Sequence, residues 1–196
     1  TINFQNWFSV GAQGLVKTAF RVVGNQVRLD FRLYNVDAQE QIDLAFSAVT
    51  VNTSEVATQV HEFVNQIVEY YTGYRGPFGS AIAFEGRGQD GSIEIYRMTV
   101  GGDGVAAITQ NRSINTLPEW AGGDIIYTSY YRGGNPDLVL GTGEERRVLS
   151  HRQGNNTGGA LSPDGTAIAS VLSMDGNTEI YLLDPTDGSI LRRLTE

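Results

Sequence analysis

The stretch GALSPDGTAIASVLSMDGNTEIYLLDPTDGSILRRLTE at residues 159–196 decides the fold class. Two apolar runs in it, Ala167–Leu172 and Ile180–Leu183, alternate with a period of two residues, which is typical of strands. Tight turns are indicated between the runs by aspartate–glycine pairs at Asp164–Gly165, Asp175–Gly176 and Asp187–Gly188. The stretch therefore predicts short antiparallel strands joined by tight turns.

The same pattern occurs twice earlier in the chain, at residues 81–110 and 124–150. Equivalent positions recur every 41 to 45 residues, and they are Phe84, Tyr127 and Ser170, then Tyr96, Val139 and Tyr181, then Thr109, Ser150 and Thr195. A short inner strand at Leu117–Trp120 and at Ala160–Leu161 brings each unit to four strands. A period of 40 to 45 residues with about four strands is typical of a β-propeller. The alternative is an ordinary antiparallel sandwich with chance similarity between its strands.

Residues 1–73 combine strand and helix patterns. Residues 3–11 resemble the end of a helix that begins before residue 1. Residues 14–23 and 26–36 predict two strands joined by a two-residue turn at Gly24–Asn25. One face of the second strand is apolar, with Val27, Leu29, Phe31 and Leu33. Residues 42–51 predict a third strand, in which Ile42, Leu44 and Phe46 are in step.

A helix is predicted after residue 51. Asn52 or Thr53 can cap its start, where Glu55 favours the positive end of the helix dipole, and Gly73 suits its end. Spacings of three and four residues form one apolar stripe from Val56, Val60, Phe63, Ile67 and Tyr70. We expect this stripe to cover one face of the three-stranded antiparallel sheet, in an α+β arrangement.

The predicted chain therefore has an α+β N-terminal piece of antiparallel strands plus helix, followed by an all-β partial β-propeller of four-stranded blades. The expected domains are a partial N-terminal domain at residues 1–75 and the partial propeller at residues 76–196. The three blades are expected at residues 80–110, 111–150 and 151–196.

Composition narrows the function classes. The 196 residues carry a formal net charge of −8, so we expect no nucleic-acid partner, because phosphates bind basic faces. No apolar run approaches the ~20 residues that span a bilayer, so we expect no membrane span. No signal peptide is visible at the first residues, which leaves a cytoplasmic, an already processed or a longer chain.

Catalytic and metal sites are not predicted. There is no cysteine, and the two histidines, His61 and His151, lie far apart in the sequence, which excludes a multi-histidine metal site. His61 is expected to be a packed or capping histidine of its helix. The Ser-Pro-Asp-Gly sequence at residues 162–165 and the aspartates of the later loops are explained by turns rather than by catalysis or calcium. We therefore predict no catalytic residue, no metal and no cofactor.

Two polar, glycine-containing loops, residues 109–120 and 150–161, are the candidate binding regions, because long loops on a rigid scaffold often carry binding sites. Both loops carry asparagines, whose amides can donate to and accept from a partner's backbone. The alternative is that these asparagines only form turns. The candidate partner-binding residues are Asn111, Asn115, His151, Asn155, Asn156 and Thr157.

Several motifs together resemble the TolB family. Residues 162–195 resemble a TolB blade in the Ser-Pro-Asp-Gly turn, the Asp-Gly turn, the Ile-Tyr pair and the closing Leu-Thr. Residues 116–140 resemble a degraded blade, because Ala121–Asp124 is two residues short and lacks Ser-Pro. Residues 4–20 and 60–84 resemble the N-terminal domain and its junction to the first blade, including Tyr71–Gly73 and Gly76–Phe78.

This resemblance implies a non-enzymatic periplasmic protein of the Tol–Pal envelope system. Such proteins join an N-terminal α/β domain to a six-bladed propeller, bind the peptidoglycan-associated lipoprotein Pal on the propeller and bind TolA through their N-terminal region. Measured against the family, the chain lacks the first part of the N-terminal domain and about three blades, so TolA binding cannot be placed on any residue here. The resemblance suggests Pal docking at the two loops. Because three blades form an open arc, we expect the chain either to be a piece of a longer polypeptide or to self-associate.

Two enzyme-related alternatives remain. One is a propeller that belongs to a prolyl oligopeptidase-like peptidase, although the Gly-x-Ser-x-Gly motif of the hydrolase domain does not occur in the chain. The other is a different propeller-based enzyme, such as a sugar-acid lyase, which would need clustered histidines for its metal.

Overall fold

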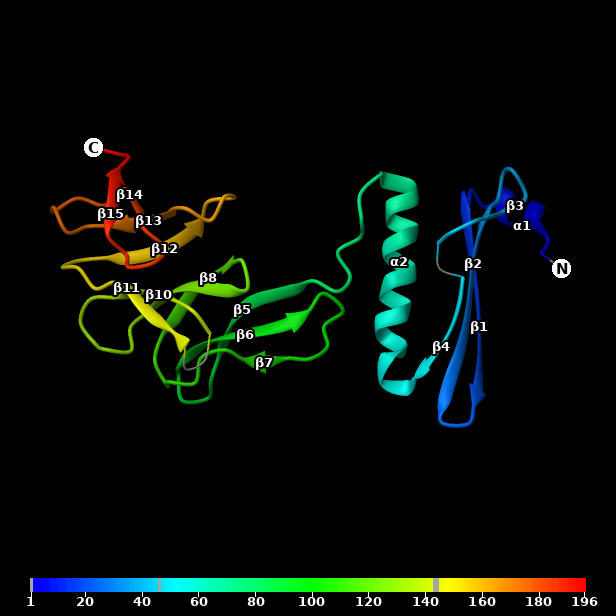
Figure 1. Cartoon of the computed structure of the whole chain (residues 1–196), viewed down its shortest axis with the longest axis horizontal. Helices are drawn as coiled ribbons and strands as arrows, with labels where there is room; N and C mark the ends of the chain where they lie inside the picture. Colours follow the sequence, from blue (N-terminus) through cyan, green and yellow to red (C-terminus); the bar gives the residue numbers. More distant parts are fainter. Residues whose placement is uncertain (1, 46, 143–144) are drawn as a thin grey trace. The chain divides into compact units, whose positions relative to one another are not determined.

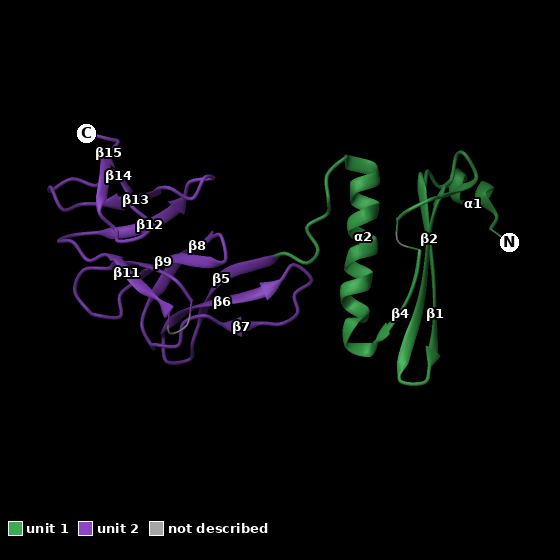
Figure 2. Cartoon of the chain, viewed as in Figure 1, with its two compact units in different colours: residues 1–80 green, residues 81–196 purple. Residues whose placement is uncertain are grey.

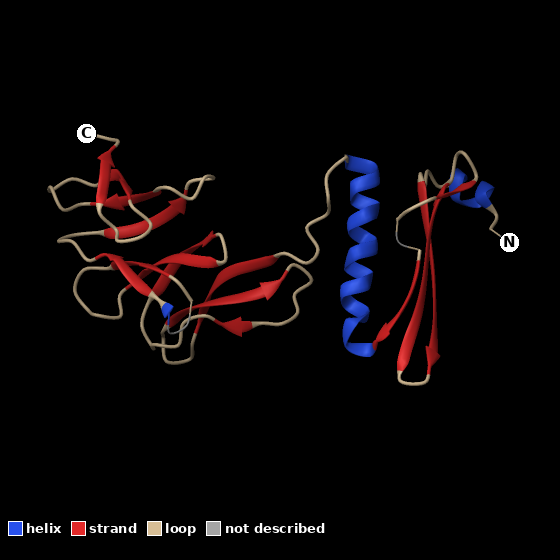
Figure 3. Cartoon of the chain, viewed as in Figure 1, coloured by secondary structure: helices blue, strands red, loops and turns tan. Residues whose placement is uncertain are grey.

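The computed structural model describes residues 2–45, 47–142 and 145–196. The chain forms two compact units, Thr1–Ser80 and Ala81–Glu196 (Figure 2). The first unit combines helices with a sheet, whereas the described part of the second unit contains strands and no α-helix (Figure 3). The α+β piece followed by an all-β region that the sequence predicts is therefore confirmed.

The first unit is built around the hairpin of β1 (Gly14–Val23) and β2 (Gln26–Asn35), which follows a short helix, α1 (Phe4–Ser9) (Figure 1). The two strands pair without interruption from Gly14↔Asn35 to Val23↔Gln26. Gly24 has a φ of +64°, the left-handed conformation that the predicted two-residue turn requires.

The third strand is not continuous, contrary to the sequence prediction. It consists of β3 (Glu40–Ile42) and β4 (Ala48–Asn52), which both pair with β2. The pairing with β2 changes register between Leu33↔Ile42 and Asp30↔Ala48, although the Phe31 N–H still donates to the Ser47 carbonyl at 2.8 Å. Leu44 leaves the strand but still packs against the core, and Phe46 lies outside the described residues.

One helix packs on the apolar face of this sheet, over the residues of β2 and β4. A 3₁₀ turn at Thr53–Glu55 leads into α2 (Val56–Thr72), and the Glu55 carboxylate accepts the backbone N–H of Asn52 at 3.0 Å. Phe63 stacks on Phe31 with ring centroids 4.7 Å apart, and Val56 and Ile67 pack beside them. Val60 and Tyr70 are 38% and 50% exposed, so the predicted stripe is only partly buried, and Val60 lines a cavity together with the exposed Val16 and Phe20 of β1.

The second unit consists of three consecutive antiparallel sheets. The first contains β5 (Ala81–Arg87), β6 (Ile93–Thr99) and β7 (Ala106–Ala107). The second contains β8 (Asn115–Ala121), β9 (Asp124–Ser129), β10 (Asp137–Leu140) and β11 (Arg147–Ser150). The third contains β12 (Asn156–Leu161), β13 (Ile168–Leu172), β14 (Glu179–Leu183) and β15 (Ile190–Arg193).

The register confirms the repeat that the sequence indicates. The predicted equivalents form directly opposite pairs in the three sheets, at Phe84↔Tyr96, Tyr127↔Val139 and Ser170↔Tyr181. The first sheet has three strands instead of the four expected. Its inner strand would have to come from residues before β5, and those residues form α2 and then turns at residues 73–80, which contain Pro77.

Apolar side chains fill both spaces between neighbouring sheets. Ile95, Ile125, Tyr127 and Val139 pack between the first and second sheets. A larger cluster, which includes Ile126, Leu138, Ile168 and Leu183, packs between the second and third. A Cβ on Gly159 of β12 would lie 2.3 Å from Cγ2 of Ile126, so glycine permits the close approach of these two sheets. The second unit is therefore a partial β-propeller.

Candidate partner-binding rim

The two candidate loops lie at the same end of the sheets. Asn115 at the start of β8 is opposite Ser129 at the end of β9, which is in turn opposite Asp137 at the start of β10. Neighbouring strands run in opposite directions in all three sheets, so every second connection along the chain lies at this end, and there are five such loops. We call them the rim, and they are residues 88–92, 108–114, 130–136, 151–155 and 173–178.

Asn111 and Asn115 form one hydrogen-bonded network in the rim. The Asn115 amide donates to Oδ1 of Asn111 at 2.8 Å, and its oxygen accepts the Ser129 hydroxyl at 2.7 Å. Asn115 has 0% exposure, whereas Asn111 is half-buried. Asn115 can therefore act on a partner only through the loop that it holds, and Asn111 remains a candidate for contact.

The same network contains a buried carboxylate that the sequence prediction did not include. Glu94 is 7% exposed and accepts the Thr109 hydroxyl at 2.5 Å, the Arg112 backbone N–H at 2.6 Å and the Asn115 amide at 3.0 Å. Buried acids recur at the equivalent positions of the other sheets, where Asp137 and Glu179 are 2% and 7% exposed. Their spacing of 43 and 42 residues follows the repeat, and this periodicity in the sequence could have identified them.

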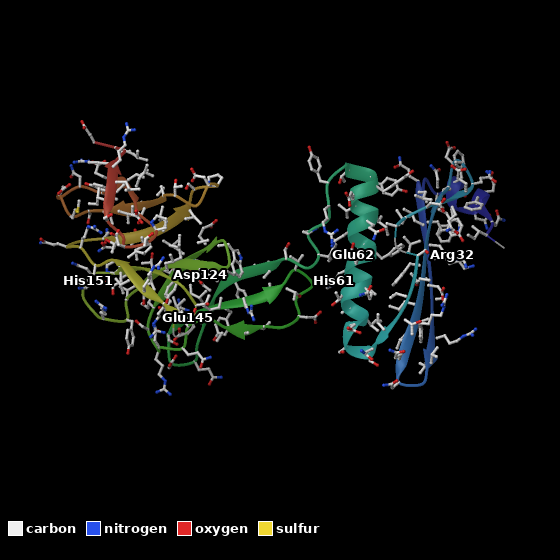
Figure 4. The ribbon with its side chains drawn as sticks, viewed as in Figure 1. Arg32, His61, Glu62, Asp124, Glu145 and His151 are labelled. Carbon is white, nitrogen blue, oxygen red and sulfur yellow. The ribbon has the colours of Figure 1, made fainter. Side chains whose placement is uncertain are left out.

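His151, which is labelled in Figure 4, is hydrogen bonded to the second of these acids, Asp137. Its Nδ1 is hydrogen bonded to Oδ1 of Asp137, and Nε of Arg132 lies 3.5 Å from the other carboxylate oxygen. The side chains of His151 and Arg132 are 52% and 54% exposed, so both reach solvent from different rim loops. Neighbouring Ser150 donates to Asn156 and accepts from Arg152, so it does not form a serine–histidine pair with His151.

Asn155, Asn156 and Thr157 differ in exposure. Asn156 has 0% exposure, accepts the Arg152 backbone N–H at 3.0 Å and donates to the Arg152 carbonyl at 2.7 Å. Asn155 is exposed and contributes its backbone N–H to Oγ of Ser173 at 2.7 Å, and Thr157 is half-buried. Like Asn115, Asn156 shapes its loop from inside, whereas the Asn155 side chain is free to meet a partner.

A groove adjoins the rim beside the second sheet. One cavity of ≈ 450 Å³ is lined by Asn111, Arg132 and Asp137, and another of ≈ 620 Å³ is lined by Gln110 and Arg112. Asn111, Tyr131 and Arg146 line both cavities, with the Arg146 guanidinium 6.0 Å from the centre of the Tyr131 ring. The sequence prediction missed Tyr131 and the three arginines, Arg112, Arg132 and Arg146. Loop residues follow no periodic pattern, so the sequence does not show which of them line a shared cavity.

The chemistry of the rim suits recognition. The exposed groups are an imidazole, amides, guanidinium groups and a phenol, all of which can donate hydrogen bonds to a protein surface. Within residues 2–45, 47–142 and 145–196, no three histidine or acidic side chains gather to hold a metal ion. Burial raises the pKa of Tyr127, which lines the groove, so its hydroxyl stays neutral.

Comparisons with known proteins agree on one family. The Tol-Pal system protein TolB of Desulfosudis oleivorans is 34% identical over 198 residues, which cover 99% of this chain and 44% of that protein. The Tol-Pal system protein TolB of Anaeromyxobacter dehalogenans is 33% identical over 199 residues, with 100% and 44% covered. The chain belongs to the TolB family. No family model matches the sequence.

A solved TolB structure supports the fold of this TolB-family chain. The crystal structure of TolB from Acinetobacter baumannii matches it with a TM-score of 0.80 at 22% identity, over 100% of this chain and 50% of that one. The chain thus spans about half the length of the relatives that it matches. Among the helices in the described residues, none is long and apolar enough to cross a membrane.

Proposed function

We propose that this chain is a non-enzymatic, protein-binding part of a periplasmic Tol–Pal component, and that its rim contacts the lipoprotein Pal. The observation that carries the proposal is the similarity to Tol–Pal system proteins along the whole chain. The rim offers a suitable surface, because its exposed side chains project from loops that buried hydrogen bonds hold in place. Such preorganisation lowers the entropic cost of binding.

The contact residues that we propose are those at which the rim is open to solvent. His151 and Asn155 are exposed, Asn111 and Thr157 are partly exposed, and Arg132 adds a cation beside them. Asn115 and Asn156 belong to the proposal only as residues that shape the loops. We assign no residue of this chain to TolA binding, and the domain limits at residues 75 and 76 also remain a proposal.

The peptidase-associated alternative is not favoured. The relatives named above are Tol–Pal system proteins, and the serine beside His151 is engaged by Asn156 and Arg152. A hydrolytic role would need a nucleophile within hydrogen-bonding reach of the histidine.

The proposal is tested by calorimetric titration of the chain with the periplasmic domain of Pal. Asn155→Glu places a charge on the rim without removing a side-chain hydrogen bond, and we expect it to weaken binding about tenfold. Thr186→Glu is the matched control, since Thr186 is exposed in a loop at the opposite end of the third sheet.

Both variants should keep the wild-type melting temperature. Asn156→Glu should lower it, because the buried amide holds the loop from inside. Equal affinity of the Asn155→Glu and Thr186→Glu variants would contradict the assignment to the rim. Absence of any binding between the wild-type chain and Pal would contradict the proposed function itself.

A further inference from the structure

The face of the N-terminal sheet that points away from α2 carries four cations. Side chains alternate along β1 and β2, so Lys17 and Arg21 share this face with Arg28 and Arg32, opposite the face that contacts Phe63. The register places Lys17 directly opposite Arg32 and Arg21 directly opposite Arg28. All four residues are exposed, and Figure 4 labels Arg32 on this hairpin.

Both cross-strand pairs are repulsive. Like charges directly opposite each other destabilise a sheet, and any anion at these sites would relieve that cost. Asp30 is the carboxylate on this face of the hairpin, and it accepts hydrogen bonds from Nη2 and Nε of Arg28 at 3.1 and 3.3 Å, which relieves part of the repulsion at the Arg21–Arg28 pair. Four of the 14 cations of a chain with a net charge of −8 thus gather on one face of one hairpin.

Protection of a sheet edge does not explain this arrangement. Cations on an edge strand discourage pairing with other chains, and β1 lies at the end of the described sheet. Arg28 and Arg32, however, belong to β2, which has β1 on one side and β3 and β4 on the other. A need for solubility would be met equally well by acids, which the rest of the chain favours.

The face is also hollow. A trough of ≈ 400 Å³ is lined by Lys17, Ala19, Arg21, Arg28, Asp30 and Arg32. Ala19 lies opposite Asp30 at the middle of the trough, between the two cation pairs. The pairs are four residues apart along each strand, which corresponds to ~13 Å at about 3.3 Å per residue.

We propose that this trough binds an extended acidic segment of a protein partner, with one carboxylate at each cation pair. In an extended chain, residues four positions apart lie on the same side at the same ~13 Å spacing, so the motif would be two acids separated by three residues. A hollow of this size admits a peptide, whereas a planar lipid surface would favour a raised basic face. This site lies in the first unit, separate from the residues of the rim.

The test uses the full 196-residue chain and a fluorescein-labelled peptide with the core Glu-Thr-Thr-Thr-Glu. Binding is measured by fluorescence anisotropy at low salt. A peptide with glutamine at both glutamate positions should bind at least tenfold more weakly. The affinity of the double variant Lys17→Glu and Arg21→Glu for the glutamate peptide should fall by a similar factor. The same variant should melt at a higher temperature, because both repulsive pairs become attractive.

A matched control reverses two exposed cations elsewhere, Arg87→Glu and Arg192→Glu, and gives the same net charge. This control should bind the peptide as the wild type does. Equal loss in the two double variants would show a net-charge effect and overturn the proposal. Binding to phosphatidylglycerol vesicles without binding to the peptide would overturn it in favour of a lipid surface, and binding to neither probe would also overturn it.

Discussion

The second and third sheets of the partial propeller share one pattern but differ in burial. Leu138 and its equivalent Ile180, 42 residues later, are 0% and 40% exposed. Leu140 is 6% exposed, whereas its equivalent Leu182 is only half-buried. The second sheet has a neighbour on both faces in this structure, and the third has one only on the face with Ile168 and Leu183. Burial in a propeller is therefore set by the neighbouring sheet and not by the residue type.

The uncovered face has a consequence for association. Ile180, Leu191 and Leu194 are 40%, 52% and 47% exposed, and exposed apolar patches promote contacts between chains. The self-association expected from the sequence stays a prediction, which light scattering at increasing concentration can check.

The largest expected effect comes from truncation at the two equivalent positions. Leu138→Ala should lower the free energy of unfolding by about 2–5 kcal/mol, because it leaves a cavity between two sheets. Ile180→Ala should cost less than about 1 kcal/mol, since its side chain is already partly in water. Urea denaturation of the two variants measures the difference. Equal losses would show that Ile180 is covered in solution, for example by a second copy of the chain.

A smaller effect is expected where the second and third sheets approach most closely. Gly159→Ala should cost about 1–3 kcal/mol, because its new Cβ would meet Ile126 at 2.3 Å and force the sheets apart. Gly123→Ala in the turn between β8 and β9 is the control, since nothing lies within 4 Å of its Cβ. Its cost should stay within about 0.5 kcal/mol. Similar unfolding midpoints for the two variants would contradict the tight packing.

Most of the fold was predictable because it depends on local periods. The alternation in β2, the helical spacing of Val56, Phe63 and Ile67, and the repeat of Phe84, Tyr127 and Ser170 are all written into the sequence. The break in the third strand was not, since the alternation of Ile42 and Leu44 continues through residues that cannot all pair with β2. The absence of an inner strand from the first sheet was not predicted either. The repeat indicates four strands for every unit, and it does not show that the residues before β5 form α2 and turns instead.

The position of the candidate rim was predictable from the sequence, but the exposure of its residues was predictable only in part. Loop length and polarity located the two loops, yet two asparagines in them, Asn115 and Asn156, turned inward. Asn115 is held by partners that are distant in sequence, such as Glu94, whereas Asn156 is held by nearby residues of its own loop, such as Arg152. The contact of Arg132 with Asp137 depends on strand register as well. The cation face of β1 and β2 was accessible from the sequence only once the pairing of the strands was known.

The turns before the second strands of the same two sheets provide a further contrast. Gly122–Gly123 alone joins β8 to β9, with a φ of +65° at Gly122. The longer turn between β12 and β13 is organised by side chains, since Oδ1 of Asp164 accepts the Ser162 hydroxyl at 2.5 Å and the Thr166 N–H at 3.1 Å. One turn relies on glycine, whereas the other depends on a carboxylate and should respond to pH.

The smallest expected effect is this pH response. The hydrogen bond from the Ser162 hydroxyl, followed by those from Thr166, lowers the pKa of Asp164 below its usual value of 3.8. Because the folded pKa lies below the unfolded one, the ionised carboxylate stabilises the turn above the unfolded pKa, and this stabilisation is lost as the pH falls through the folded pKa. In an NMR titration, the Thr166 amide should shift with a midpoint below 3.8, and Asp164→Asn should abolish the shift. The amide of Asp124 beside the glycine turn should show no such dependence on Asp164, and a Thr166 midpoint at or above 3.8 would mean that these hydrogen bonds do not persist in solution.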